Sequence, residues 1–495
     1  MFKKILIANR GEIALRVMAA CREMGIATVA VYSEADQAAL HTRSADEAVL
    51  IGASEPAQSY LNVARIIEVA QQTGAEAVHP GYGFLAENAD FAQACQDSGI
   101  VFIGPPAQAI RDLGNKTVAR KMMLDGGVPV VPGMTEPDLD PGRVAVHADQ
   151  IGYPVLVKAA AGGGGKGMRI VKTPAELASA LASAASEAKA AFGDGSVYLE
   201  KFITNPRHVE IQVLADTHGN IIHLFERECS IQRRHQKIIE ETPSTAVNDE
   251  LRQKMGEAAV QAAATAGYVN AGTVEFILDE DGRFYFLEAN TRLQVEHPIT
   301  EMITGVDIVR RQIEIAAGLP LDLRQEDVTA RGHAIECRIY AEDPANDFFP
   351  SPGKIKYLKE PTGPGIRNDC GVYQGFSVPV EYDPILSKLV VHAETREAAI
   401  DRMKKALSDY VVVGIKTPTQ FLSDVIDSQP FREGKTLTSF IDTYFPSWQP
   451  TLPDKALAAL AFIADGMAGK RVTDAVAEGP AEIPLPWQTL GHWRL

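Results

Sequence analysis

The hydrophobic pattern of the first hundred residues alternates between short apolar runs and stretches with a helical period. Residues 4–8, 27–32, 77–80 and 101–103 are apolar runs typical of buried strands, and residues such as 13–24 and 62–73 between them are helical in pattern. This alternation predicts a doubly wound parallel sheet, a Rossmann-like domain. The first turn lacks the repeated glycines of a dinucleotide-binding loop, so we do not expect an NAD site there.

Polar residues occupy every second position of a later stretch. The apolar run 284–287 is followed by Glu288, Asn290, Arg292, Gln294 and Glu296. Side chains two apart share one face of a strand, so the pattern predicts a strand face with two carboxylates, two amides and a guanidinium. Such alternation is most often a solvated face. Here it follows a run that is apolar at both parities, as in a strand buried on both faces, and this favours a ligand site.

The stretch before this run supplies a carboxylate opposite Glu288. Asp281-Gly282 is a strong signal for a two-residue hairpin turn, and such a turn places Glu275 directly opposite Glu288. Like charges opposed across two strands are destabilising, and neither carboxylate has a cation at the obvious neighbouring position. Because Mg²⁺ or Mn²⁺ with oxygen ligands would relieve the repulsion, we predict a metal site here.

A glycine-rich loop follows a predicted strand that ends near Lys158. Four successive glycines, 162–165, precede Lys166, and peptide N–H groups without side chains nearby are open to phosphate oxygens. No Ser or Thr follows the Gly-Lys pair, so this is not a Walker A loop. A flexible surface hairpin is the alternative interpretation, and phosphate-covering loops often act as lids.

Three further segments carry candidate chemistry. Residues 227–237 concentrate cations, which is as often a solvated face, although Lys237 with Arg292 would suit a small planar oxyanion such as bicarbonate or a carboxylate. Residues 79–88 follow a predicted strand, at the sheet edge that ligands favour, although their glycines are equally well turn residues. Arg338 is a charge within an apolar strand and therefore needs a partner or a substrate anion.

Composition and charge narrow the class of protein. The 495 residues suffice for several domains, and the net charge of −16 argues against a general nucleic-acid surface. The five cysteines are scattered without Cys-x-x-Cys spacing, which disfavours a zinc site and favours free thiols in a reducing cytoplasm. No apolar stretch is long enough for a signal peptide or a membrane span. We therefore expect a cytoplasmic protein that binds neither nucleic acid nor membrane.

Together these motifs resemble the biotin carboxylases, a branch of the ATP-grasp superfamily. The resemblance runs from residue 4 to about residue 445 and is most specific in residues 79–88, 162–167, 227–237, 290–298 and 382–384. It implies an α/β and α+β multidomain fold with a Rossmann-like domain at 1–114, an ATP-grasp domain at 115–328 with a lid at about 133–203, a β-rich C-terminal domain at 329–445, and a linker or interaction tail at 446–495.

The resemblance also implies a ligase reaction and a role for each matching residue. ATP phosphorylates bicarbonate, and the resulting carboxyphosphate yields CO₂ that carboxylates N1 of biotin. The implied metal ligands are Glu275, Glu288 and Asn290. The implied ATP-binding residues are Lys116, Lys158, Gly163, Gly164, Gly165, Lys166, Glu200, Lys201, Ile203, His208, Gln232 and His235, with Glu275 and Glu288. The implied bicarbonate site is Lys237, Arg292, Gln294 and Val295. Glu296 matches the base that deprotonates bicarbonate, Arg338 the residue that stabilises the biotin enolate, and Tyr82 lines the biotin approach; the catalytic set is Glu296, Arg338, Arg292 and Lys237.

Two features depart from the family pattern. Ala289 stands where the family usually has Met, off the polar face. No Ala-Met-Lys-Met type of biotin-attachment sequence occurs, and the nearest look-alike, Met403-Lys404-Lys405, lies in a predicted helix at 396–409. The resemblance therefore implies biotin on a separate biotin carboxyl carrier protein, a separate carboxyltransferase, and a homodimer.

Alternatives remain for the reaction and for the final acceptor. The acceptor is acetyl-CoA or another acyl-CoA, or pyruvate in a two-subunit pyruvate carboxylase. Rival functions are another ATP-grasp ligase that forms an acyl phosphate, such as a carbamoyl phosphate synthetase or a purine-pathway carboxylase, and a degenerate paralogue that only scaffolds a complex. Residues 486–495 resemble the stretch that follows this module in biotin-containing acyl-CoA carboxylase subunits, so the tail is a candidate interface or a disordered remnant.

Overall fold

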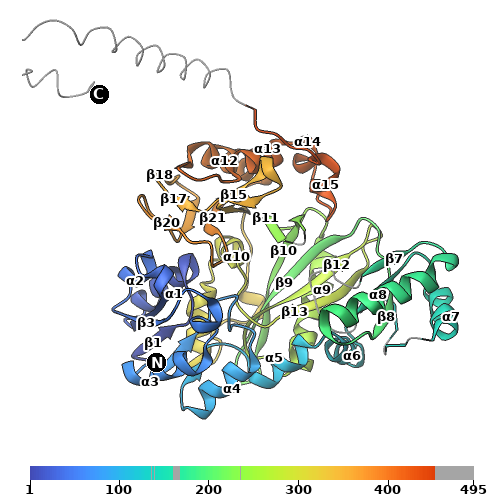
Figure 1. Ribbon diagram of the computed structural model, residues 1–495, viewed down its shortest axis with the longest axis horizontal. Coiled ribbons are helices and arrows are strands. Elements are labelled where there is room, and N and C mark those ends of the chain that lie inside the picture. Colours follow the sequence, from blue (N-terminus) through green and yellow to red (C-terminus); the bar gives the residue numbers. More distant parts are fainter. Residues whose placement is uncertain (135–136, 139, 160–167, 235, 452–495) are drawn as a thin grey trace, which may run out of the picture. The chain divides into compact units, whose positions relative to one another are not determined.

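The computed structural model describes residues 1–134, 137–138, 140–159, 168–234 and 236–451 (Figure 1). The chain divides into two units, 1–448 and 449–495, and the fold and the site below belong to the first. No helix among the described residues is both long and apolar enough to cross a membrane.

A five-stranded parallel sheet forms the N-terminal part of the chain, drawn in blue in Figure 1. Ile5 and Ile7 of its central strand pack with Ile13 of the first helix, whereas Leu6 faces the other side and packs with Ile66 of a later helix. Alternate side chains of one strand thus contact helices on opposite faces, which confirms the predicted doubly wound sheet. The strand order is β3-β2-β1-β4-β5, and the elements are β1 (Lys4–Ile7), α1 (Gly11–Glu23), β2 (Ala27–Ser33), α2 (Leu40–Ser44), β3 (Glu47–Gly52), α3 (Val63–Thr73), β4 (Ala77–His79), α4 (Ala89–Asp97), β5 (Val101–Phe102), α5 (Ala107–Gly114) and α6 (Lys116–Asp125).

A smaller three-stranded sheet with two helices has a core of its own (Figure 1). Its strand order is β7-β6-β8. It falls within the segment that the sequence analysis assigns to a lid, and the glycine-rich loop at 160–167 lies outside the described residues. The elements are α7 (Pro141–Ile151), β6 (Val155–Ala159), β7 (Arg169–Val171), α8 (Leu177–Phe192) and β8 (Val197–Lys201).

An eight-stranded antiparallel sheet carries most of the remaining chain. Its order is β13-β12-β9-β10-β11-β14-β21-β19, so strands from both sides of the predicted boundary at residue 328 pair directly. Residue 337 of β14, for example, pairs with residue 239 of β11. The strands are β9 (Arg207–Ala215), β10 (Ile221–Arg233), β11 (Gln236–Thr242), β12 (Asn270–Leu278), β13 (Phe284–Asn290), β14 (His333–Tyr340), β19 (Ile366–Cys370) and β21 (Ile385–Ala393).

Helices and short strands complete this unit. The helix predicted at 396–409 is present with those bounds. The elements are α9 (Asp249–Thr265), α10 (His297–Thr304), α11 (Ile308–Ala316), β15 (Glu342–Asp343), β16 (Phe349–Pro350), β17 (Gly353–Lys354), β18 (Tyr357–Lys359), β20 (Ser377–Val378), α12 (Arg396–Asp409), β22 (Val411–Val413), α13 (Thr419–Asp427), α14 (Gln429–Arg432) and α15 (Phe440–Tyr444).

The hairpin between β12 and β13 differs from the prediction in its turn but not in its key pair. The Asp279 N–H donates to the Arg283 carbonyl over 2.9 Å, which closes a three-residue loop, so the predicted two-residue turn is wrong. A register shift on β13 compensates for the extra residue, and Glu275 pairs with Glu288 as predicted. A bulge of this kind re-aims the side chains beyond it.

Two further predictions need correction. The run 284–287 is not fully buried on both faces, because Phe284, Tyr285 and Leu287 are only half-buried. Trp448, assigned to the tail, packs with its ring against Phe421 (centroids 5.3 Å apart) and donates from Nε1 to Asp424 over 2.7 Å. The compact unit therefore includes Trp448.

Truncating the core of the large sheet should destabilise the protein. Phe276 is fully buried and meets Phe284 edge to face, so Phe276→Ala is expected to cost about 3–5 kcal/mol. The exposed Leu124 is the control, and Leu124→Ala should stay within about 0.5 kcal/mol. Denaturant unfolding followed by fluorescence measures both, and equal stabilities for the two variants would contradict this packing.

Candidate active site

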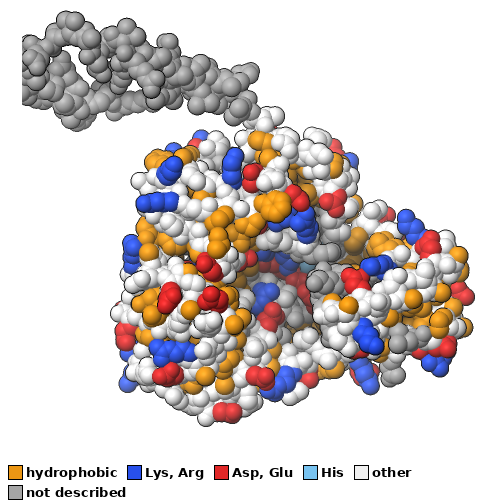
Figure 2. All heavy atoms as spheres, viewed as in Figure 1, with side chains coloured by type: hydrophobic (Ala, Val, Ile, Leu, Met, Phe, Trp, Pro, Cys, Tyr) orange, Lys and Arg blue, Asp and Glu red, His pale blue; other side chains and the backbone are white. Residues whose placement is uncertain are grey.

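A cavity of about 1200 Å³ lies among the N-terminal sheet, the three-stranded sheet and the large sheet. Figure 2 shows a hollow in which acidic and basic side chains gather. Most of the predicted site residues line this cavity: Tyr82, Lys116, Lys158, Glu200, His208, Gln232, Lys237, Glu275, Glu288, Asn290, Arg292, Gln294, Val295 and Arg338.

The remaining predicted residues are placed differently. Lys201 and Ile203 are not among the lining residues, and the Lys201 ammonium donates to the Gly152 carbonyl over 2.8 Å. Glu296 is fully buried behind Lys237 and Arg338. Gly163, Gly164, Gly165, Lys166 and His235 lie outside the described residues.

Lys237 is the charge centre of the site. Its Nζ lies 2.6 Å from Glu210 Oε2, 2.7 Å from Glu275 Oε1 and 2.7 Å from Glu296 Oε1. The lysine comes from β11 and the carboxylates from β9, β12 and the segment before α10. Burial opposes its charge, but the three carboxylates raise the pKa of Lys237 well above its usual value. Lys237 is therefore an ammonium that joins three elements.

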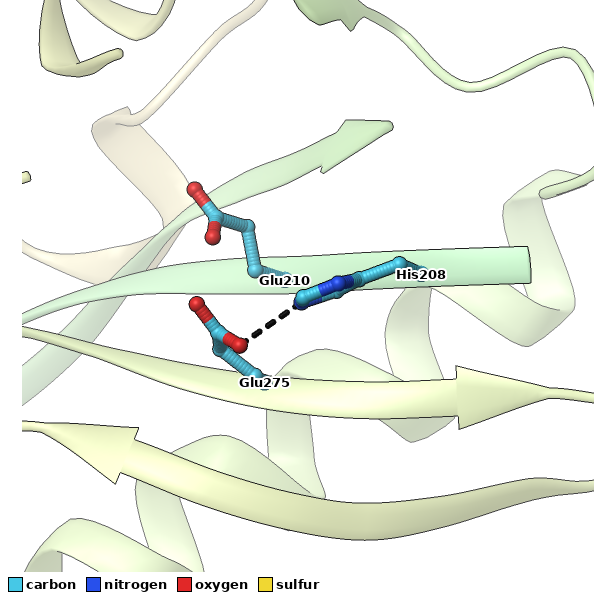
Figure 3. A group of neighbouring side chains, drawn as sticks. All are labelled: His208, Glu210 and Glu275. Atoms are coloured by element: carbon cyan, nitrogen blue, oxygen red, sulfur yellow. Dashed lines mark ion pairs between the residues drawn. The ribbon is translucent and has the colours of Figure 1, made fainter. Parts of the chain in front are cut away.

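Glu275 has a second cationic neighbour, shown in Figure 3. His208 Nε2 lies 2.7 Å from Glu275 Oε2, and in β9 His208 and Glu210 share one face, beside Glu275 of β12. Burial acts against ionisation, but Lys237 and His208 lower the pKa of Glu275 far below its ordinary value. The expectation that Glu275 lacks a neighbouring cation is therefore wrong, because the lysine arrives from β11, which is not a neighbour of β12 in the sheet.

The opposed carboxylates fit a divalent metal better on their cavity side than around His208. Glu288 is 42 % exposed, and Lys116 Nζ is 3.7 Å away. Asn290 donates from Nδ2 to Glu275 Oε1 over 2.7 Å. Two carboxylates and an amide on paired strands suit Mg²⁺ or Mn²⁺. By contrast, the close group of His208, Glu210 and Glu275 is already balanced by Lys237, so a further cation is not needed there.

The polar ladder leaves the strand after two of its five members. β13 ends at Asn290, so Glu288 and Asn290 alone lie on the strand, and the prediction of one continuous strand face is wrong beyond that point. Glu87 from the loop after β4 accepts from the Thr291 N–H at 3.0 Å and from Arg292 Nε at 2.8 Å. This carboxylate holds the chain after the strand in an irregular path toward α10.

The irregular segment still brings its polar side chains together. Arg292 Nη1 donates to Gln294 Oε1 over 3.0 Å, and the Gln294 Nε2 is a buried donor that meets no acceptor of the described residues. Lys388 donates from Nζ to the Val295 carbonyl over 3.0 Å. An unpaired amide donor beside a guanidinium at a cavity wall fits a small anion.

Glu296 is a carboxylate held between cations. Its Oε1 meets Lys237, and its Oε2 accepts from Arg338 Nη2 over 3.0 Å. Burial alone would raise its pKa, but Lys237, Arg338 and Arg227 hold the pKa of Glu296 well below its usual value. Arg338 in turn donates from Nε to Glu240 over 2.6 Å. The buried charge of Arg338 is therefore compensated by two carboxylates, those of Glu296 and Glu240.

The far end of the cavity carries two lysines that are also paired. Lys158 forms a short ion pair with Glu200, and Arg120 Nη1 lies 3.3 Å from the other Glu200 oxygen. Lys116 faces Glu288. Separate cations along one wall, each near a carboxylate, are suited to a polyphosphate chain that can replace the internal acids as partner.

Two residues that shape the site were not assigned a role from the sequence. Arg227 is fully buried and donates to Glu210, to Gln212 over 2.8 Å and to Thr300 over 3.0 Å. Lys388 sits in an apolar strand, the same signal that identified Arg338. Applied to every strand, that signal would have found Lys388, whereas Arg227 lies between Glu226 and Glu228 and was noted only as part of the cation-rich run 227–237.

Comparison with known proteins gives consistent results along the chain. The family model described as biotin carboxylase, N-terminal domain, matches residues 1–110, the carbamoyl-phosphate synthase L chain ATP binding domain matches 115–324, and the biotin carboxylase C-terminal domain matches 336–443. A pyruvate carboxylase subunit from Methanothermobacter thermautotrophicus is 56% identical over 90% of this chain and 90% of its own.

Two other similarities extend this result. The alpha subunit of methylcrotonoyl-CoA carboxylase from Dictyostelium discoideum is 49% identical over 99% of this chain and 70% of its own. The solved biotin carboxylase domain dimer of Hydrogenobacter thermophilus 2-oxoglutarate carboxylase, in complex with MgADP, ADP and bicarbonate, superposes with a TM-score of 0.86 at 49% identity, over 91% of this chain and 100% of that one. The chain therefore belongs to the biotin carboxylase family, and its ATP-grasp domain makes it a ligase.

Proposed function

We propose that the protein carboxylates biotin on a separate carrier protein, using ATP and bicarbonate. The observation that carries this proposal is the buried carboxylate Glu296, which joins Lys237 and Arg338 and thereby links two predicted subsites of one cavity. The similar solved structure that contains MgADP and bicarbonate supports the same ligands here. Lys116, Lys158 and the glycine-rich loop are the residues for the phosphates.

The metal site would consist of Glu275, Glu288 and Asn290. A bound Mg²⁺ or Mn²⁺ would neutralise phosphate charge during transfer. Asn290 ends β13 and Arg292 follows two residues later, so along the chain the proposed metal ligands directly precede the proposed bicarbonate site.

Bicarbonate would bind between Lys237 and Arg292, with Gln294 Nε2 and the backbone at Val295 as further contacts. Glu296 would take the bicarbonate proton, because the surrounding cations keep this carboxylate ionised at neutral pH. The freed oxygen attacks the γ-phosphorus, ADP leaves, and carboxyphosphate then breaks its C–O bond to give CO₂ and phosphate. The released phosphate takes the proton from N1 of biotin, Arg338 stabilises the resulting enolate, and N1 then bonds to CO₂.

Activity with free biotin tests the proposal directly. We expect ADP release that requires bicarbonate and rises with biotin, together with carboxybiotin formation measured from ¹⁴C-bicarbonate. Ammonia should have no effect on ADP release. Stimulation by ammonia without carboxybiotin would instead favour an acyl-phosphate ligase of another kind, and absence of any turnover would favour a scaffold.

Removing the base should stop the first chemical step. Glu296→Ala is expected to lower bicarbonate-dependent ADP release about 10²–10⁴-fold, because no carboxylate remains to accept the proton. Asp281→Ala, at the exposed tip of the β12–β13 hairpin, is the matched carboxylate control and should keep full activity. A Glu296→Ala enzyme with unchanged ADP release would exclude this role.

Removing Arg338 should separate the two halves of the reaction. Arg338→Ala is expected to lower carboxybiotin formation about 10²–10³-fold, since a charge that stabilises the enolate is lost, while bicarbonate-dependent ADP release persists. The ratio of carboxybiotin to ADP measures the effect. A normal ratio in this variant would contradict the assignment of Arg338 to biotin.

We further propose that the protein works as the homodimeric biotin carboxylase component of an acetyl-CoA or other acyl-CoA carboxylase, with a biotin carboxyl carrier and a carboxyltransferase on other chains. Similarity to methylcrotonoyl-CoA carboxylase over 99% of the chain, including residues beyond 445, supports an acyl-CoA acceptor. The alternative is a two-subunit pyruvate carboxylase, supported by the 56% identity to a pyruvate carboxylase subunit. Co-purified partner chains assayed with acetyl-CoA and pyruvate would distinguish these acceptors.

A further inference from the structure

Two buried carboxyl groups face each other directly behind Arg338. Glu240 of β11 pairs with Glu336 of β14 in the antiparallel register, and both side chains are fully buried. Glu240 Oε1 accepts from Arg338 Nε over 2.6 Å. No donor of the described residues reaches Glu240 Oε2 or either oxygen of Glu336.

The charged groups around this pair are already engaged. Arg338, on the same strand as Glu336, divides its guanidinium between Glu240 and Glu296. Lys388, from the neighbouring β21, donates to the Val295 carbonyl and lies 3.2 Å from Glu12 of α1. Lys237, on the strand of Glu240, is bonded to Glu210, Glu275 and Glu296. Among the described residues, Glu336 is therefore left without a cation of its own.

An ionised Glu336 would be a buried charge without a hydrogen-bond donor, which is one of the costliest arrangements in a protein. A protonated Glu336 needs only one acceptor, and Glu240 Oε2 is an acceptor without a donor on the residue directly opposite. Carboxyls on directly paired strand residues have Cβ atoms about 4.5–5.5 Å apart, within reach of a shared proton.

We propose that Glu240 and Glu336 form a buried acid–carboxylate pair that holds one proton and positions Arg338. Protonated Glu336 donates a hydrogen bond to Glu240 Oε2, and Glu240 Oε1 accepts from Arg338 Nε. The proton keeps a third negative charge away from the guanidinium, so that Arg338 stays between Glu240 and Glu296 with its outer edge at the cavity. Arg338's contact with biotin rests on the proposed function, whereas the pair itself does not.

The electrostatics agree with this geometry. Burial, and then the charge of Glu240, raise the pKa of Glu336 well above its usual value, and burial raises the pKa of Glu240 to about 7 in spite of Arg338. The neighbouring Glu241 has other partners, and its pKa shifts in the opposite direction. Against burial, His333 and Arg396 lower the pKa of Glu241.

The pH dependence of thermal unfolding tests the pair. Since a folded-state proton on Glu336 is lost in the unfolded chain above a pH of about 4.5, wild-type stability contains a penalty that grows as pH rises. Glu336→Gln lacks that penalty. Its melting temperature relative to wild type should therefore rise by at least about 2 °C between pH 5 and pH 8.

Asp216→Asn is the control, because the Asp216 carboxylate is buried and its hydrogen-bond partners, the Asn220 side chain and three backbone N–H groups, do not titrate. Against burial, these hydrogen bonds lower the pKa of Asp216. It is therefore ionised in both folded and unfolded chains above pH 5, and this variant should be less stable than wild type by an amount that stays constant from pH 5 to pH 8. A constant difference for Glu336→Gln as well would overturn the pair. Because unfolding requires no substrate, this result is independent of whether the protein carboxylates biotin.

Two more measurements test the buried acid and the role of Glu240. Infrared spectra of the wild-type protein at pH 8 should contain a protonated-carboxyl C=O band that shifts in D₂O, and its absence would exclude a buried acid even if Glu336→Gln fails to fold. In an active enzyme, Glu240→Gln should raise the KM for free biotin at least ~10-fold more than the KM for ATP. Equal changes in both KM values would show that Glu240 does not position Arg338.

Discussion

The ammonium of Lys237 is the interaction on which the centre of the site depends. Three buried or nearly buried carboxylates, Glu210, Glu275 and Glu296, converge on it within 2.7 Å. Without that cation, each would be a desolvated negative charge beside two others, and breaking a buried ion pair costs several kcal/mol, about 3–5. Fully buried Arg227 binds Glu210 from the other side. The carboxylates are thus fixed by charge compensation before any ligand arrives.

The continuous sheet explains how this convergence is achieved. Glu210 and Glu275 are paired residues of β9 and β12, while Lys237 comes from β11 on the far side of β10. The long side chain of lysine spans the intervening strand along the polar face. The sheet then continues into β14 and β21, so Arg338 and Lys388 occupy paired positions. A single sheet therefore brings residues more than a hundred positions apart into one charge network.

The sequence predicts local order better than the partners of charged groups. Strand and helix periods correctly predict the N-terminal sheet and the helix at 396–409, because burial on defined faces imposes these periods. The pair of Glu275 and Glu288 is also correct, although a longer loop and a bulge produce it. The cations around Glu275 were not predictable, since they approach through tertiary register. The end of β13 at Asn290 was also missed, because Glu87, a residue distant in sequence, holds the chain there.

The pairing of cations with carboxylates also affects how the cavity binds ligands. Each predicted ligand-binding lysine or arginine that lines the cavity among the described residues already has a carboxylate partner, as Lys116 has Glu288, Lys158 has Glu200 and Arg292 has Glu87. An entering phosphate or bicarbonate oxygen therefore exchanges one anionic partner for another. Such an exchange adds little net affinity per contact, because the internal pair must be broken, but it spares the cations from being unpaired when no ligand is bound. Specificity then comes from the positions of the cations, which the carboxylates hold in advance.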